Sequence, residues 1–140
     1  MTQAGRWLLV WCGVAVVMTG FDLLWLGWLM RPFYAEALGP LLAAPAYAPA
    51  AALFYGFYVT AIVVYAVWPA SAPREAAWRG FHLGLVAYGT YELTNWAVIA
   101  GWPARLVPVD VFWGLVLTSA VAAVGAWLRQ RLTREPSGEL

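Results

Sequence analysis

Two carboxylic acids stand inside long apolar stretches of the chain, Asp22 in the first quarter and Glu92 in the third. An ionisable side chain at the centre of a membrane helix costs about 2.5–3.5 kcal/mol on insertion scales, so it marks a functional position by default. Two carboxyl groups brought close together can share one proton. We therefore expect Asp22 and Glu92 to form a pair that binds a polar group or serves as acid and base.

Polar and aromatic residues recur at helical spacing around these acids. Tyr88, Glu92 and Asn95 are spaced by four and three, so they share one face of a helix. A second series consists of Tyr55, Tyr58, Ile62 and Tyr65, spaced by three, four and three. Facing inward, the two series would enclose a pocket lined by tyrosine hydroxyls and capped by carboxyls. The predicted ligand-binding residues or polar core are Asp22, Tyr55, Tyr58, Tyr88, Glu92, Asn95, Asp110 and Trp113.

Each of these residues also has a purely structural explanation, which the sequence leaves open. Asp22 could pair with Arg31 or Arg105, or accept a bond from a tyrosine. Asp110 follows a proline and would stand in the first turn of its helix, where the exposed N–H groups favour an acid. Tyrosines at helical spacing are often packing residues. A site and a satisfied core therefore remain alternatives at this point.

The other residues capable of chemistry do not form a motif. His82 has no partner histidine or cysteine nearby in the sequence, and three acids with one distant histidine do not suggest a metal site. The lone Cys12 lies in an apolar run, and a single cysteine cannot form an internal disulfide. We predict neither a metal nor a cofactor.

Apolar runs must position these side chains. The chain of 140 residues is 64% apolar and only 11% charged, which is too little charge for an ordinary soluble domain. Crossing a hydrocarbon core takes about 20 apolar residues as a helix. Four runs qualify, 7–30, 50–68, 78–100 and 107–128, and their continuous apolar character disfavours a β-barrel. The first run shows no convincing cleavage site, so we expect a retained helix rather than a signal peptide.

The predicted fold is an all-α membrane protein, a four-helix transmembrane bundle over residues 1–132. Gly80 and Gly84 should let a neighbouring helix approach closely. Segment 32–39 begins with a proline and ends at a glycine, which predicts a short interfacial helix on the outer surface. The polar tail 133–140 is predicted to be disordered and cytoplasmic.

Arginine placement predicts the orientation, because short cytoplasmic loops carry the positive excess. With the N-terminus inside, two arginines fall on the outer side, Arg31 and Arg105. Six fall on the inner side: Arg6, Arg74, Arg79, Arg129, Arg131 and Arg134. Both termini should therefore be cytoplasmic. At about 1.5 Å per residue, Asp22 and Glu92 come out at the same depth in the outer half of the membrane. The arginines form no basic patch, so nucleic-acid binding is not expected.

Several short motifs together resemble a known family. They are Phe21-Asp22-Leu23-Leu24-Trp25-Leu26-Gly27, Phe33-Tyr34, Leu53-Phe54-Tyr55, Ala87-Tyr88-Gly89-Thr90-Tyr91-Glu92-Leu93-Thr94-Asn95, Gly101-Trp102-Pro103 and Val109-Asp110-Val111-Phe112-Trp113-Gly114. The chain resembles the bacterial predicted membrane proteins that carry domain of unknown function 2177. The resemblance implies four helices in the bacterial inner (cytoplasmic) membrane. The family pattern usually has an aspartate where this chain has Glu92 and a lysine where it has Ala100. The glutamate keeps the carboxyl group with a longer reach, and the fixed outer cation is missing.

The resemblance assigns no activity, so four functions compete. The first is a protein that binds or carries a small amphipathic or lipid-like molecule, since ligand pockets combine aromatic walls with a few polar groups. The second is a membrane-embedded, isomerase-like lipid-modifying enzyme that uses Asp22 and Glu92 as an acid pair. The third is an accessory subunit of a larger membrane complex, and the fourth a proton-coupled transporter built as a homodimer. We place the binding protein first. The sequence leaves open whether the chain is an enzyme.

Overall fold

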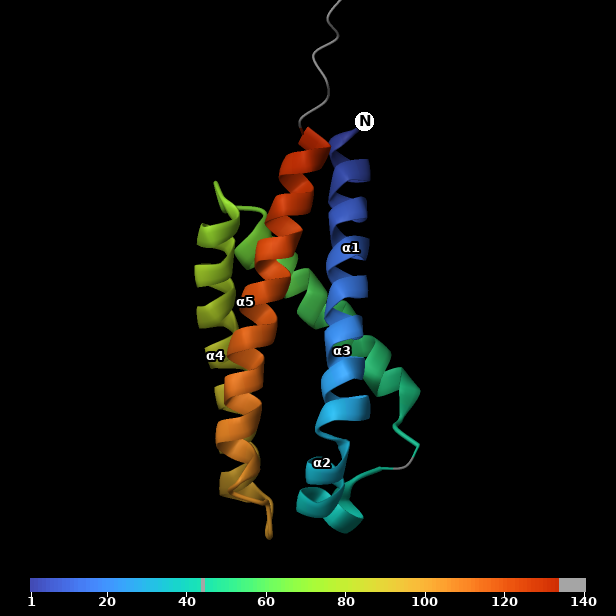
Figure 1. Ribbon diagram of the computed structural model, residues 1–140, viewed down its shortest axis with the longest axis vertical. Coiled ribbons are helices and arrows are strands. Elements are labelled where there is room, and N and C mark those ends of the chain that lie inside the picture. The colour runs from blue at the N-terminus through green and yellow to red at the C-terminus, as the bar shows by residue number, and fades with distance from the viewer. Residues whose placement is uncertain (44, 134–140) are drawn as a thin grey trace, which may run out of the picture.

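The computed structural model describes residues 1–43 and 45–133, and within them every regular element is a helix. Five α-helices follow one another along the chain (Figure 1). They are α1 (Gln3–Leu24), α2 (Arg31–Leu38), α3 (Ala48–Ala61), α4 (Pro73–Val98) and α5 (Leu106–Thr133). Two of them continue into π-helical turns, α1 into Trp25–Leu29 and α3 into Ile62–Val67, and α2 is followed by the short 3-10 turn Gly39–Leu41.

The long helices run roughly along one axis (Figure 1). α5 lies between α1 and α4 and packs most extensively against α4, while α3 crosses behind at a steeper angle. The start of α1, the end of α5 and the connection between α3 and α4 lie at one end of the molecule. The short helix α2 and the connection between α4 and α5 lie at the other end.

Three of the four predicted spans are confirmed as helices long and apolar enough to cross a membrane. They are Gln3–Leu29, Ala48–Val67 and Leu106–Thr133. The fourth predicted span, 78–100, is not among them: it coincides with α4 up to Val98, and α4 is 26 residues long but richer in polar residues than these three. Residues 32–38 of the predicted short helix lie in α2, and Gly39 begins the 3-10 turn that follows. Thr133 ends α5, and the rest of the predicted disordered tail, 134–140, lies outside the described residues.

Local sequence explains where several helices begin. The Thr2 hydroxyl accepts a bond from the Gly5 N–H at 3.1 Å and so caps α1. Proline occupies the first turn of α2, α3 and α4, where the missing N–H has no intrahelical partner to lose. Gly101, with φ of 79°, turns the chain sharply after α4.

The π-helical turn at the end of α3 changes which residues face inward. Along α3 and this turn the buried positions recur as pairs four residues apart: Tyr58 and Val59, Ile62 and Val63, Ala66 and Val67. Tyr65 consequently points outward and is 66% exposed, whereas Tyr58 is buried. The predicted inward series of tyrosines is therefore wrong at Tyr65. A wider π turn shifts the helix face, and nothing in the three-four spacing indicates it.

Small residues allow the closest helix contact, between α4 and α5, as the Gly80–Gly84 spacing predicts. A Cβ atom added at Gly80 would lie 2.9 Å from the Ala122 Cβ. One added at Gly84 would lie 2.9 Å from the Gly114 carbonyl carbon. Both distances are too short for real Cβ contacts, so glycine is needed at these positions for α4 to lie this near to α5.

The distribution of polarity is inverted relative to a water-soluble protein. Asp22, Glu92 and Thr118 are buried between the helices. Large apolar side chains cover the outside, with Phe57 76% exposed and Val16 72% exposed. An apolar exterior around a partly polar interior is the arrangement that a bilayer stabilises, because lipid tails take up the apolar surface.

Candidate functional site

The predicted acids gather at the end of the molecule that holds α2. Asp22 stands near the end of α1, Glu92 in the second half of α4 and Asp110 in the first turns of α5. Asp22 is 4% exposed and Glu92 is fully buried. Three separate helices thus bring carboxyl groups to one end of the bundle.

Both carboxylate oxygens of Asp22 accept hydrogen bonds from neutral donors. The Tyr55 hydroxyl donates to Oδ2 at 3.1 Å, and the Trp113 indole Nε1 donates to Oδ1 at 3.0 Å. The structure thus realises the tyrosine alternative for Asp22. Arg105 instead forms an ion pair with Glu36 at 2.9 Å.

An aromatic stack and two hydrogen bonds connect Asp22 to Asp110. The Trp113 ring lies parallel to that of Trp25, with centroids 4.3 Å apart and an interplanar angle of 2°. The Trp25 Nε1 donates to the Tyr34 hydroxyl at 3.3 Å, and Tyr34 donates to Asp110. Burial, together with the bond to Asp110, raises the pKa of the Tyr34 phenol above its ordinary value. Tyr34 therefore remains a proton donor at neutral pH.

Glu92 has one satisfied oxygen and one without a donor. The Trp102 indole Nε1 donates to Oε2 at 3.0 Å. The turn at Gly101 directs the chain back so that Trp102 can reach α4. The other oxygen, Oε1, is buried and has no N–H or hydroxyl donor among the described residues. The Asp110 carboxyl group lies within hydrogen-bonding reach of the Glu92 carboxyl group. The acid adjacent to Glu92 is thus Asp110, whereas Asp22 has its own set of partners.

The remaining predicted residues lie around this arrangement. Tyr58 shares a 2.7 Å hydrogen bond with Thr118 and meets the Tyr88 ring edge-on at 6.1 Å. Tyr88 packs directly over Gly114, where any side chain would collide with the tyrosine ring. Asn95 is half-buried and contacts Tyr91 rather than an acid. Tyr58 and Tyr88 therefore form a packed layer next to the acids, and Asn95 lies apart from them.

Sequence reasoning missed three members of the site, Trp25, Tyr34 and Trp102. All three belong to the short motifs that carry the family resemblance. Their positions at the end of α1, in α2 and in a connection gave no periodic pattern to place them beside an acid. The sequence offered one signal. Trp25 stands in the same motif as Asp22, and Trp102 stands in the motif that follows the one with Glu92.

No group of three histidine, cysteine, aspartate or glutamate side chains within residues 1–43 and 45–133 is arranged to hold a metal ion. The donors around the acids are two indoles and two phenols, which bind carboxylates as hydrogen-bond donors. The arrangement can hold protons and accept hydrogen bonds from a bound polar group.

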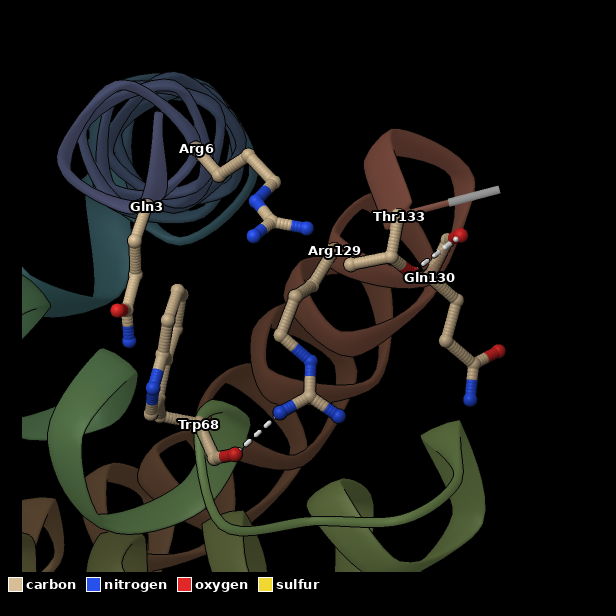
Figure 2. A pocket seen from close by; sticks show the side chains of 6 residues that line it. All are labelled: Gln3, Arg6, Trp68, Arg129, Gln130 and Thr133. Atoms are coloured by element: carbon tan, nitrogen blue, oxygen red, sulfur yellow. Dashed lines mark hydrogen bonds between the residues drawn. The ribbon is translucent and has the colours of Figure 1, made fainter. Parts of the chain in front are cut away.

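Two pockets lie at the opposite end of the molecule, and neither is lined by Asp22, Glu92 or Asp110. One, of about 240 Å³, is lined by Gln3, Arg6, Trp68, Arg129, Gln130 and Thr133 (Figure 2). The other lies beside Ser71, Glu75 and Trp78, around the start of α4.

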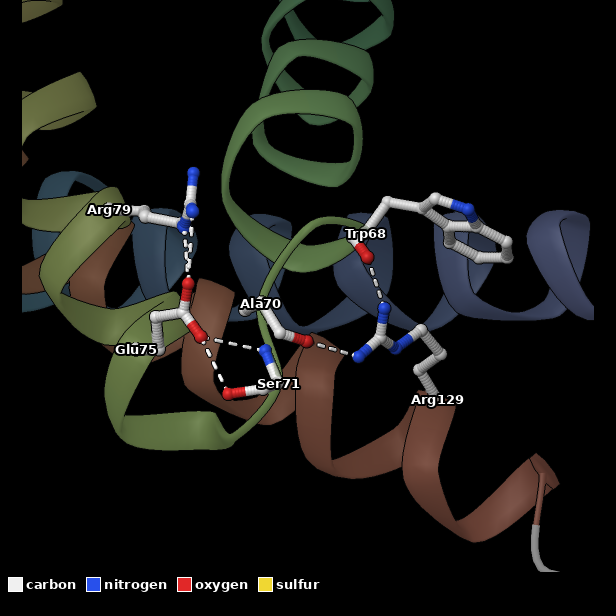
Figure 3. A network of polar contacts seen from close by, with 6 residues as sticks. All are labelled: Trp68, Ala70, Ser71, Glu75, Arg79 and Arg129. Atoms are coloured by element: carbon white, nitrogen blue, oxygen red, sulfur yellow. Dashed lines mark hydrogen bonds and ion pairs between the residues drawn. The ribbon is translucent and has the colours of Figure 1, made fainter.

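A polar network fixes the connection between α3 and α4 at this same end (Figure 3). Arg129 donates to the carbonyl oxygens of Trp68 and Ala70. Glu75 accepts bonds from the Ser71 backbone N–H and hydroxyl, both at 2.8 Å, and from Arg79 at 3.0 Å. These donors, the Ser71 backbone first, lower the pKa of the Glu75 carboxyl to about 2.

Comparison with known proteins identifies the family of this chain and no nearer relative. No curated protein and no solved structure matches it. A family model described as predicted membrane protein (DUF2177) matches residues 7–127, which include every acid and aromatic residue of the site described above. The chain therefore belongs to the DUF2177 family of predicted membrane proteins.

Proposed function

We propose that the protein crosses the bilayer four times, with α4 as the third crossing. α4 has 26 residues, which is about 39 Å of helix at 1.5 Å per residue and exceeds a hydrocarbon core of about 30 Å. Between residues 83 and 98 its outward residues are mainly apolar, including Leu85, Val86 and Leu93, and none of them is charged. Gly80, Gly84 and Glu92 are buried against the neighbouring helices. The one acid of this stretch, Glu92, is thus hidden from lipid, and the exposed threonines Thr90 and Thr94 are uncharged.

In this proposal both termini are cytoplasmic, in the inner membrane of a bacterium. The arginine bias of six against two supports this orientation. The start of α1, the end of α5 and the α3–α4 connection lie at the same end of the molecule, which is consistent with it. The acids then lie in the outer half of the membrane. The short helix α2 lies beside them at the outer surface.

Within this frame the protein binds or carries a small amphipathic molecule through its polar head. The observation that carries this proposal is the buried Glu92 oxygen that lacks a donor. No N–H or hydroxyl group of the described residues bonds to this oxygen, so a ligand that supplies a hydroxyl or amino group can donate to it, beside the neighbouring carboxyl group of Asp110. The aromatic rings of Trp102, Trp25 and Trp113 provide apolar contacts near the same acids.

The Glu92–Asp110 contact determines what kind of head group fits. Two carboxyl groups within hydrogen-bonding reach of each other share a proton, because two carboxylates have no donor between them. Such a pair carries one negative charge and offers both an acceptor and a donor. It therefore favours a hydroxyl group, which can donate to one acid and accept from the other, or a protonated amine.

Native mass spectrometry of the purified protein tests the proposal. The probes are a long-chain monoacylglycerol, whose head carries hydroxyl groups, and the methyl ester of the same fatty acid, which has no donor. The wild type should retain the monoacylglycerol and not the ester. Glu92→Gln should lose this retention, because an amide places an NH₂ group where the carboxyl presents its second oxygen.

Glu36→Gln is the matched control, since Glu36 is an exposed acid at the same end that pairs with Arg105. It should retain the monoacylglycerol as the wild type does. Equal retention of the two probes, or undiminished retention by Glu92→Gln, would contradict the proposal.

The same carboxyl pair supports a second function, acid–base chemistry on a lipid-like substrate. One acid that holds a proton beside one that lacks it is the arrangement needed to remove a proton at one atom and return it at another. This enzymatic alternative uses Glu92 and Asp110 in place of Asp22 and Glu92. An isomerised product recovered from the bound fraction, formed by the wild type and not by Glu92→Gln, would favour it over simple binding.

A further inference from the structure

The pocket at the end opposite the acids combines two arginines with neutral polar groups. Arg6 enters it from the first turns of α1, and Arg129 enters it from the end of α5 (Figure 2). Gln3, Gln130 and Thr133 add an amide or hydroxyl group each, and Trp68 supplies an aromatic wall. The lining contains no aspartate or glutamate.

The charge of Arg129 is held in place without being neutralised. Its guanidinium group donates to the carbonyl oxygens of Trp68 and Ala70, and it lies 5.8 Å from the centre of the Trp68 ring. These partners are neutral. Arg129 forms no ion pair with an acid in the described part of the chain, so its positive charge remains available to the pocket.

Arg6 adds a second uncompensated charge. No side-chain hydrogen bond or ion pair joins it to another residue within 1–43 and 45–133. The pocket also lies beside the beginning of α1, where Gln3 is the first helical residue. The exposed N–H groups at a helix N-terminus reinforce attraction for an anion.

We propose that this pocket binds a phosphate group. Guanidinium groups match the geometry of phosphate oxygens and donate two bonds at once, and neutral amides and hydroxyls complete the coordination. The pocket lies at the ends of three helices apolar enough to span a membrane, which is the depth of lipid head groups. The phosphate therefore comes either from an anionic phospholipid or from a soluble phosphate compound. The proposal does not depend on the carboxyl site at the other end.

The test compares wild-type protein with Arg6→Gln and Arg74→Gln. Arg74 is the matched control because it is an exposed arginine at the same end that lies outside this pocket. Both variants lose one positive charge, and Arg6 makes no side-chain bond in the described fold, so Arg6→Gln should fold normally. Thermal stability without phosphate checks this for both variants.

Two arms identify the source of the phosphate. In the first, native mass spectrometry measures retention of phosphatidylglycerol. In the second, thermal unfolding in detergent is compared in inorganic phosphate and in chloride at equal ionic strength. We expect wild type and Arg74→Gln to respond equally in at least one arm. Arg6→Gln should bind about tenfold more weakly there, as expected for the loss of a charge-assisted hydrogen bond.

The pattern of responses decides the proposal. A response to phosphatidylglycerol alone supports it and identifies a lipid head group as the ligand. A response to inorganic phosphate supports it and shows that a soluble phosphate is accepted. No response in either arm, equal binding by Arg6→Gln and wild type, or an equal loss in Arg74→Gln would overturn it.

Discussion

At the residue scale, Asp22 of α1 accepts hydrogen bonds from a phenol and an indole that come from two other helices. Tyr55 belongs to α3 and Trp113 to α5, so one carboxyl group ties three helices together. Each oxygen of the Asp22 carboxyl group has a neutral hydrogen-bond donor, so no positively charged side chain is needed beside it. In a membrane interior this avoids the cost of burying a second ion.

Removing one of these donors should destabilise the protein measurably. Tyr55→Phe deletes the hydroxyl that donates to Asp22 and leaves a buried oxygen without a partner, which should cost about 1–3 kcal/mol. Tyr65→Phe is the control, because Tyr65 lies on the same helical segment, faces outward and is 66% exposed. Unfolding by a denaturing detergent in mixed micelles measures both. Equal stability of the two variants would contradict the assigned role of Tyr55.

Glu75 gives the protein a defined response to acid at the end opposite the buried acids. Its pKa falls from 4.5 to about 2 because the Ser71 backbone N–H, the Ser71 hydroxyl and Arg79 all donate to the carboxylate. A carboxyl with a lowered folded-state pKa contributes stability above its unfolded pKa, and this contribution is lost as pH falls through the folded value. The loss should therefore occur between about pH 4.5 and about pH 2.

Amide hydrogen exchange at the start of α4 measures this response. The Ser71 and Ala76 amides should exchange faster as pH falls through this window, after correction for the intrinsic pH dependence of exchange. Glu75→Gln should remove the change, and Ser71→Ala should reduce it, since the Ser71 backbone N–H remains. Because Glu75 is exposed, added salt should weaken the effect. An unchanged pH response in Glu75→Gln would refute this interpretation.

How far the site could be predicted is decided by the spacing of its members. Asp22 and Glu92 are evident in the sequence because acids in apolar runs are rare. Their partners are not evident. Trp113 and Asp22 are 91 positions apart, and Trp102 reaches Glu92 only because the chain turns at Gly101. Contacts of this kind depend on how helices pack, and helical periodicity carries no information about them.

At the element scale, glycine determines how closely α4 approaches α5. The Gly80–Gly84 spacing predicts this contact, and the structure adds Gly114 as the facing residue. The π-helical turns are the part that periodicity missed. Neither Trp25–Leu29 nor Ile62–Val67 contains a proline or another signal that indicates a π turn. Regular helical spacing therefore predicts the wrong side for Tyr65, which lies in the second of them.

Two glycines of the same helix should respond oppositely to alanine. Gly84→Ala brings a Cβ atom against the Gly114 carbonyl group, and the resulting strain should cost about 1–3 kcal/mol. Gly89→Ala places its methyl group in open space, so stability should stay the same or rise slightly. Thermal unfolding in detergent compares the two. Destabilisation of similar size in both variants would show that α4 does not approach α5 through Gly84.

At the scale of the whole molecule, the apolar exterior and partly polar interior are what composition alone predicts. With 64% apolar residues, the chain needs a nonpolar solvent. Most of these residues are gathered in four runs of about the length that crosses a hydrocarbon core. Composition also explains why α4 differs from the other long helices. It carries the buried Glu92, the glycines Gly80 and Gly84 that face α5, and exposed polar residues such as His82 and Thr90.

Accessibility to a membrane-impermeant thiol reagent tests the proposed orientation. In a Cys12→Ser background, a cysteine at Ser71 should react only from the cytoplasmic side, and one at Ala104 only from the outer side. Ser71 lies in the α3–α4 connection and Ala104 in the α4–α5 connection, at opposite ends of α4. Intact cells and permeabilised cells are compared. Reaction of both positions from one side would rule out α4 as a membrane crossing.

Infrared spectroscopy of the protein in lipid bilayers tests the central claim most directly, that Glu92 and Asp110 share one proton. At neutral pH the wild-type spectrum should contain a carbonyl band of a protonated carboxyl group. This component should be missing from both Glu92→Gln and Asp110→Asn and retained in Glu36→Gln. If the wild type lacks this band, or if it persists unchanged in both pair variants, the two acids do not share a proton and the binding site proposed at this end is wrong.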